Sequence, residues 1–199
     1  AELHHIAEIA TRLGTTAPIS LRVNPDVDPK THPYISTGLK ESKFGIPMDQ
    51  ALQLYRTAQT LTGIAIKGID CHIGSQITQL APYLDALDKM FELIDQLADQ
   101  GIALEHFDIG GGMGVRYEQE PDFPLQALSD ALQQKMADRD LRVILEPGRY
   151  IIANAGVLLT EVLYTKHNAT RAFALVDAAM HDLIRPAPYY AVQAAHPLV

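Results

Sequence analysis

The sequence predicts an α/β fold in which parallel βα units form about half of a (β/α)8-type barrel and lead into the first strands of a β domain. Segments with the apolar periodicity of a helix alternate four times with short apolar segments typical of buried strands. Glycines, prolines and charged residues collect in the loops that follow the strands rather than those that follow the helices. In a parallel barrel these loops form the functional face.

The composition is that of an ordinary globular protein. The 199 residues are 47% apolar and 20% charged, which is enough for one sizeable core. The net charge of -8 argues against a nucleic-acid or membrane surface, so we expect small molecules or protein as partners. The single cysteine, Cys71, excludes a disulfide framework and a cysteine-rich zinc site and fits a reducing compartment, so the cytoplasm is the expected location. No signal peptide or membrane-length apolar run is expected.

The first elements follow from local patterns. Residues 2–13 have apolar residues three and four apart and predict a helix that Gly14 ends. Residues 19–23 predict a buried strand that stops at Asn24-Pro25. The polar loop that follows, through Lys43, is long enough to suggest a functional excursion at the barrel rim or a subunit contact.

The remaining units repeat this order. Helices are expected at 47–61, 81–100 and 125–137, and strands at 64–73, 106–109 and 141–146. Beyond Ile151, segments 155–164 and 171–176 are strand-like with no amphipathic helix between them. We therefore expect part of a barrel over 1–150, and over 151–199 a crossover into the start of a C-terminal β domain. Four units leave a barrel open, with unpaired edges and an exposed apolar interior.

The strand at 141–146 ends abruptly at Glu146-Pro147-Gly148-Arg149. Pro147 cannot donate to a sheet ladder, and Gly148 allows the backbone to approach a ligand closely. A carboxylate and a guanidinium that meet one ligand suit a phosphorylated heterocycle, since Glu146 can hold a ring nitrogen protonated while Arg149 faces an anion. The alternative is an ion pair at the end of a strand, followed by a turn.

His72 stands at the carboxyl end of the strand at 64–73. Strand alternation places it on the side of Asp70 and places Cys71 on the opposite side, so the two cannot form a nucleophilic pair, and Cys71 is expected to be a small core residue. The imidazole can lie flat against a ring, near the Ser75 hydroxyl, which can bond a phosphate. The alternative is a hydrogen-bonded structural histidine.

Gly110, Gly111 and Gly112 follow the strand at 106–109, and their amides can form an anion cradle. Their spacing is not that of a dinucleotide fingerprint. A flexible turn is the alternative. Because Ser75, the glycine cluster and Gly148-Arg149 follow three different strands, we expect them to converge on one phosphate at one face of the barrel.

Arg185 and Tyr189 form another candidate pair, a cation and a phenol four residues apart. Such a pair suits a carboxylate on a substrate, and a surface salt bridge is the alternative. No metal site is expected.

With these residues assembled, the chain resembles the diaminopimelate decarboxylase family, pyridoxal-phosphate enzymes of the alanine-racemase-like barrel class. The matching motifs, in family order, are Arg22-Val23-Asn24-Pro25, Ser42-Lys43-Phe44-Gly45, His72-Ile73-Gly74-Ser75-Gln76, Asp108 to Gly112, Glu146 to Arg149, and Asp182 to Ala187 with Tyr189. The resemblance implies about the second half of a TIM-type barrel and the cofactor pyridoxal phosphate.

The resemblance also implies a role for each site residue. His72 would stack on the cofactor ring, and Glu146 would pair with the pyridine nitrogen. Ser75, the glycine loop and Gly148 would receive the phosphate. The far end of the substrate would be held by Arg149, Arg185 and Tyr189. The implied activity is decarboxylation of meso-diaminopimelate to L-lysine, the last step of lysine biosynthesis, by a cytoplasmic homodimer.

Departures from the family pattern lead us to expect a central fragment that is inactive alone. None of the seven lysines has the early-strand setting of the family's cofactor-binding lysine, and the cysteine-glutamate-serine motif of the later β domain is absent. The chain also begins with Ala1 rather than methionine. His181 stands where the family often has asparagine, and Pro188 replaces a usual leucine.

Two other functions stay open from the sequence. One is a non-catalytic fragment that binds a phosphorylated ligand or a partner protein. The other is a decarboxylase of the same fold that acts on ornithine or arginine, whose cationic tail would call for an acidic residue in place of the pair Arg185 and Tyr189.

Overall fold

The computed structural model describes residues 1–29, 43–117, 121–179 and 181–183 and divides into two compact units. Unit 1 comprises residues 1–115 and 121–150, and unit 2 comprises 116–120 and 151–199. In the described part of the chain, no helix is both long enough and apolar enough to span a membrane.

Unit 1 is built on a five-stranded sheet in the order β2-β1-β3-β4-β5. The strands are β1 (Ala17–Asn24), β2 (Ile46–Pro47), β3 (Ile64–Asp70), β4 (His106–Asp108) and β5 (Arg142–Ile144). All neighbouring strands are parallel, and Asp70, Asp108 and Ile144 lie level with one another across β3, β4 and β5. The predicted α/β fold of parallel βα units is confirmed, and the carboxyl ends of these strands meet at one edge.

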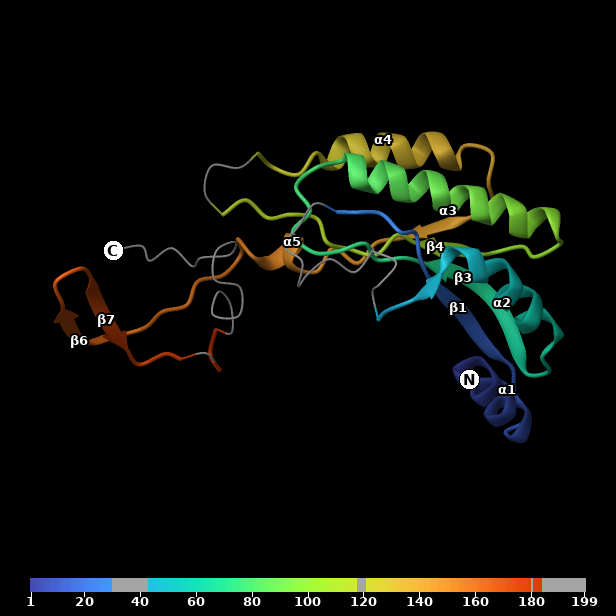
Figure 1. Ribbon diagram of the computed structural model, residues 1–199, viewed down its shortest axis with the longest axis horizontal. Helices are drawn as coiled ribbons and strands as arrows, with labels where there is room; N and C mark the ends of the chain where they lie inside the picture. The colour runs from blue at the N-terminus through green and yellow to red at the C-terminus, as the bar shows by residue number, and fades with distance from the viewer. Residues whose placement is uncertain (30–42, 118–120, 180, 184–199) are drawn as a thin grey trace. The chain divides into compact units, whose positions relative to one another are not determined.

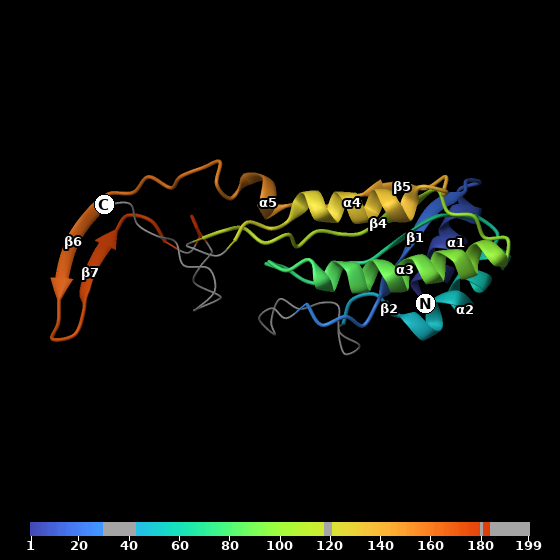
Figure 2. The same ribbon diagram turned by 90° about the horizontal axis from the view of Figure 1, so that it is seen from above.

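The helices of unit 1 are α1 (Glu2–Arg12), α2 (Met48–Thr60), α3 (Ala81–Asp99) and α4 (Leu125–Met136). α2 contacts α3, and α3 runs beside α4 (Figures 1 and 2). The buried side chains of α2, α3 and α4 join those of the strands in one core, which includes Tyr55, Ile69, Leu97, Phe107 and Leu128. The apolar stripe expected over residues 2–13 is only partly buried, since Ile9 on α1 and Leu13, just after it, are exposed.

The opposite face of the sheet is more polar than we expected for an open barrel interior. Ser20 donates a hydrogen bond to Asp70 across β1 and β3, and Gly68 lies directly against the His106 ring across β3 and β4. Strand alternation adds Asp108 to the same face. The expectation of an apolar interior was therefore wrong for this face of β1, β3 and β4. On β5, the apolar side chain of Ile144 is exposed.

Unit 2 contains an antiparallel hairpin, β6 (Val162–His167) and β7 (Ala172–Val176). The side chains of both strands are exposed. The turn between them is organised by the Asn168 side chain, whose Oδ1 accepts from the backbone N–H of Thr170 (3.0 Å) and Arg171 (2.7 Å). The first strand begins at Val162 rather than at residue 155. A short helix, α5 (Arg149–Ile152), and β2 were not expected.

Candidate functional site

The candidate site lies where β3, β4 and β5 end, because backbone pairing continues past the strands into the loops. These bonds run from Cys71 N to Asp108 O (2.9 Å), from Ile109 N to Ile144 O (3.1 Å) and from Glu146 N to Gly110 O (2.8 Å). Three loops that are distant in sequence are thereby held next to one another. We call this meeting of the loops after β3, β4 and β5 the three-loop junction, residues 71–77, 109–115 and 145–149.

The glycine cluster is packed inside this junction. A β-carbon at Gly110 would overlap the carbonyl oxygen of Cys71, one at Gly111 that of Glu146, and one at Gly112 that of Gly74. Gly110 and Gly112 also have positive φ angles of 73° and 95°, which favour glycine. The cluster is thus a close contact of three backbones and not the flexible turn weighed above.

The glycine cluster is also held from both sides. Ile77 N donates to Gly112 O (2.9 Å), and Gly114 N donates to Ile77 O (2.8 Å), which forms a parallel bridge between two of the loops. From α3, the buried Tyr83 hydroxyl donates to Gly111 O (2.8 Å). Burial raises the pKa of Tyr83, so the phenol keeps the proton that it donates.

His72 is half-buried beside the glycine cluster. Its Nδ1 accepts a hydrogen bond from the Gly111 backbone N–H (3.2 Å), so the neutral ring carries its proton on Nε2. Burial and the positive charge of Arg22 lower the pKa of His72, while Glu146 and Asp108 oppose that shift. The imidazole is therefore neutral and held in one orientation, an arrangement compatible with both the structural and the cofactor-stacking interpretations. Cys71 is buried in the core on the other face, as predicted, and burial raises its pKa to about 12.

Arg149 links two loops. Its Nη2 donates to Ser75 Oγ (2.7 Å), and its Nη1 donates to Gln76 Oε1 (3.4 Å). A hydroxyl that accepts from a guanidinium still has its own hydrogen to donate. A cation and a hydroxyl thus meet beside the glycine cluster, and the two together are donors suited to an anion.

Carboxylates lie on the strand face beside this donor set. Burial raises the pKa of Asp70, and the negative charges of Asp108 and Glu146 add to that effect, whereas the Ser20 hydrogen bond (3.1 Å) and Arg22 oppose it. The Glu146 side chain itself is exposed. It is therefore accessible to a ligand while its backbone is fixed to Gly110.

Gly148 differs from the clustered glycines. It has a positive φ of 52°, but a β-carbon there would meet nothing nearer than Glu146 O at 3.7 Å. Glycine at this position supports the backbone conformation of the loop and leaves open space above it.

Of the residues predicted from sequence, His72, Ser75, Gly110, Gly111, Gly112, Glu146, Gly148 and Arg149 all fall in the three-loop junction. Arg185 and Tyr189 lie outside the described residues, as does most of the loop between Asn24 and Lys43. Sequence reasoning assigned no role to Arg22, Asp70, Gln76 or Tyr83. Gln76 directly follows Ser75 in a motif, which was the one signal available for it. Among the described residues, no group of three or more histidine, cysteine or acidic side chains is placed to hold a metal.

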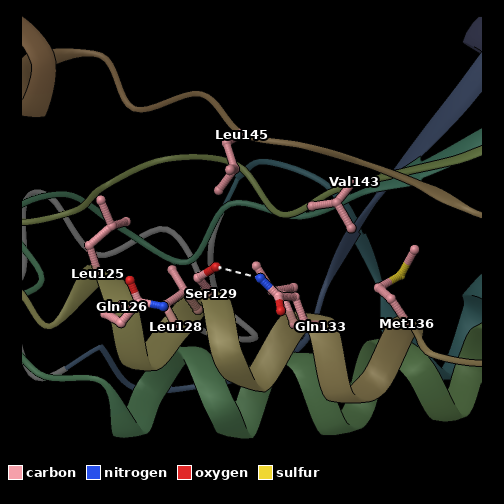
Figure 3. A pocket seen from close by; sticks show the side chains of 9 residues that line it. Leu125, Gln126, Leu128, Ser129, Gln133, Met136, Val143 and Leu145 are labelled. Carbon is pink, nitrogen blue, oxygen red and sulfur yellow. Dashed lines mark hydrogen bonds between the residues drawn. The ribbon is translucent and has the colours of Figure 1, made fainter.

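A groove of about 670 Å³ lies elsewhere, between α4 and β5 (Figure 3). It is lined by Leu125, Gln126, Leu128, Ser129, Leu132, Gln133, Met136, Val143 and Leu145. Val143 and Leu145 alternate with Ile144 and Glu146 along the chain, so the groove is on the opposite side of that segment from Glu146. It includes none of the candidate site residues.

Comparison with known proteins identifies two family models on the chain. Residues 1–153 match the model described as pyridoxal-dependent decarboxylase, pyridoxal binding domain. Residues 149–199 match the model described as pyridoxal-dependent decarboxylase, C-terminal sheet domain.

Individual proteins give the same result. The chain is 54% identical over 199 residues to diaminopimelate decarboxylase from Pseudomonas aeruginosa, covering 98% of this chain and 48% of that protein. Diaminopimelate decarboxylase from Helicobacter pylori, solved in complex with L-lysine, superposes with a TM-score of 0.90 at 44% identity, over 97% of this chain and 48% of that one. Lysine decarboxylase from Selenomonas ruminantium superposes with a TM-score of 0.73 at 29% identity, over 89% and 45% of the two chains. The chain spans about half the length of the relatives that it matches.

Proposed function

We propose, from the premise that this chain belongs to the pyridoxal-dependent decarboxylase family, that the protein carrying it converts meso-diaminopimelate to L-lysine with pyridoxal phosphate as cofactor. The structural observation that carries the proposal is the bond from Arg149 to Ser75, which joins the loops after β5 and β3 beside the closely packed glycine cluster of the third loop. The substrate is inferred from the 54% identity to a diaminopimelate decarboxylase.

The residues present fit the phosphate of that cofactor. Arg149 supplies a positive charge and Ser75 a hydroxyl, and the backbones of Gly110, Gly111 and Gly112 approach so closely that side chains there would fill the junction. A phosphate favours such a combination of a guanidinium and a hydroxyl group. When bound, the cofactor supplies an electron sink for the charge left on the α-carbon as carbon dioxide departs.

Two side chains of this chain would act on the cofactor ring. Glu146 would hold the ring nitrogen protonated, for which an accessible carboxylate is suited. His72 would lie against the ring as a neutral imidazole, because burial lowers its pKa and Gly111 N–H occupies Nδ1. Arg149, Arg185 and Tyr189 would hold the distal carboxylate of the substrate.

We also propose that residues 1–150 form part of a (β/α)8 barrel and that residues 151–199 lead into a C-terminal β domain, in a cytoplasmic homodimer. The two compact units divide next to Tyr150, and the two family models overlap at residues 149–153. Both observations support this domain boundary. The dimer and the cytoplasmic location rest on the family resemblance and on the single cysteine.

A second candidate is a decarboxylase of the same fold that acts on a cationic amino acid such as ornithine or arginine. The likeness to lysine decarboxylase from Selenomonas ruminantium favours it. The chain is 29% identical to that lysine decarboxylase and 54% identical to a diaminopimelate decarboxylase, so we rank this candidate second.

The test is substrate preference in the full-length protein that carries this chain. The purified protein is loaded with pyridoxal phosphate, and carbon dioxide release is measured with meso-diaminopimelate, lysine, ornithine and arginine at equal concentrations. We expect release from diaminopimelate, with lysine as the product, to exceed the others. Faster release from ornithine or arginine would establish the second candidate, and no release from any of the four would refute both.

A further inference from the structure

We propose that Gln76 is a positioning residue that holds the glycine loop and Arg149 in the arrangement that receives a phosphate. This inference rests on the proposed function, because the phosphate is taken to be that of pyridoxal phosphate. Gln76 lies in the loop after β3, next to Ser75, and its side chain is buried, with only 8% of the residue exposed.

The Gln76 carboxamide pairs with the backbone of one residue in the next loop. Its Nε2 donates to Val115 O (2.6 Å), and its Oε1 accepts from Val115 N (3.2 Å). The side chain therefore pairs with residue 115 as a neighbouring strand would. The contact lies beside the parallel bridge between Ile77 and Met113, so it extends the pairing of the two loops that flank the glycine cluster.

The same oxygen also meets Arg149. Because Nε2 is committed to Val115 O, the orientation of the carboxamide is fixed, and Oε1 faces both the Val115 N–H and Arg149 Nη1 (3.4 Å). Ser75 accepts from the other terminal nitrogen of the guanidinium (2.7 Å). Two consecutive residues thus orient the cation, and one of them also holds the glycine loop.

The backbone conformation of Gln76 also supports the positioning role. Its φ is +59°, in the left-handed region that residues with a β-carbon rarely adopt. Glycine would adopt this conformation more easily but would supply no carboxamide. A glutamine is favoured here because its side chain makes contacts that offset the cost of the backbone.

The experiment compares Gln76→Ala, Gln76→Gly and Gln76→Glu in the full-length protein. Gln79→Ala is the matched control, since Gln79 is the same residue type in the same loop and is exposed. Dissociation constants are measured for pyridoxal phosphate and for pyridoxal, which lacks the phosphate. Amide exchange over residues 112–117 is measured in the cofactor-free protein.

We expect Gln76→Ala and Gln76→Gly to weaken pyridoxal phosphate binding by about tenfold, as loss of a charge-assisted contact would, and to weaken pyridoxal binding much less. Gln76→Glu should weaken pyridoxal phosphate binding further, because a carboxylate would pair with Arg149 and repel the phosphate. Amide exchange at 112–117 should be faster in the alanine and glycine variants. Gln79→Ala should match the parent in every measurement.

Wild-type affinity in Gln76→Gly would overturn the proposal, because the residue would then serve only the backbone conformation. Equal losses for pyridoxal phosphate and pyridoxal would also overturn it, as they indicate a general folding defect. The proposed function fails separately. If the parent binds pyridoxal phosphate but releases no carbon dioxide from diaminopimelate, that function is refuted, while the selective loss in the Gln76 variants still supports the positioning role.

Discussion

The three-loop junction and the β6–β7 hairpin are held by hydrogen bonds of very different range. In the junction, Gln76 bonds Val115 across 39 positions, and Arg149 bonds Ser75 across 74. In the hairpin region, Asn168 bonds Arg171 across three positions, and Thr160 bonds Asp177 across 17. The junction contacts therefore need the assembled sheet of unit 1, whereas these hairpin contacts join residues at most 17 positions apart.

Ionisable groups in the two regions differ in the same way. In the junction and the elements next to it, burial is the main cause of the lowered pKa of His72 and of the raised pKa of Tyr83 on α3 and of Asp70 on β3. In the hairpin region, Asp177 is fully exposed, and its pKa is lowered mainly by the hydrogen bond from Thr160 and then by that from the Glu161 backbone. Substitutions should therefore have large, cooperative effects in the junction and small, local effects in the hairpin.

The largest difference is expected for catalysis, on replacing Glu146 by glutamine. A neutral amide cannot hold the ring nitrogen protonated, so Glu146→Gln should keep the cofactor bound yet slow decarboxylation by about 10²–10³-fold, the usual loss for one electrostatic group of this kind. The backbone bond from Glu146 N to Gly110 O is unaffected by this change. Cofactor occupancy and kcat are measured together.

The matched control is Glu161→Gln, in the strand region of unit 2, which should leave kcat unchanged. Turnover of Glu146→Gln at the parent rate would remove Glu146 from the chemistry. The alternative given for Glu146, an ion pair at the end of the strand, would then stand.

The next largest effect is expected on the free energy of unfolding, when Gly111 is replaced by alanine. Gly111→Ala would place a β-carbon onto the Glu146 carbonyl oxygen, and overpacking of this kind typically costs about 1–3 kcal/mol. Gly156→Ala in unit 2 has nothing within 4 Å of the new carbon, so its change should stay within about 0.5 kcal/mol. Free energies of unfolding in urea test the pair, and equal values would mean that the junction is not closely packed.

Local sequence patterns were sufficient to predict the parallel βα units, because periodicity and breakers are local signals. They also placed His72 and Cys71 on opposite faces, since alternation along a strand is fixed. The Gln76 to Val115 contact was out of reach, because it joins residues 39 apart through a left-handed backbone conformation. The start of β6 was misplaced because the apolar run from 155 does not reveal where pairing begins.

A smaller effect is expected on removing the Tyr83 hydroxyl, which α3 presents to the junction. Tyr83→Phe removes the hydrogen bond to Gly111 O, and one such bond contributes about 0.5–1.5 kcal/mol net to the free energy of unfolding. Tyr164→Phe is the control, since Tyr164 is 72% exposed on β6 and should show no change. If both variants unfold at the same urea concentration as the parent, the tyrosine makes no net contribution to holding the glycine loop.

The smallest effect is expected in the hairpin region, from titration of Asp177. Its carboxylate accepts from the Thr160 hydroxyl (2.5 Å) and from the Glu161 N–H (2.9 Å), and these bonds lower its pKa in the folded state. A depressed folded pKa means that the carboxylate contributes stability above the pKa of the unfolded chain and loses that contribution as the pH falls through the folded pKa. The Glu161 amide resonance, followed by NMR as the pH is lowered, should therefore titrate below the pKa of an unperturbed aspartate, and Asp177→Asn should abolish this titration.

Resonances of residues 112–115 should not respond to that variant, because the hairpin contacts are local. A titration midpoint at or above the unperturbed value would show that these bonds do not favour the carboxylate. A response at residues 112–115 would show instead that the hairpin and the junction are coupled.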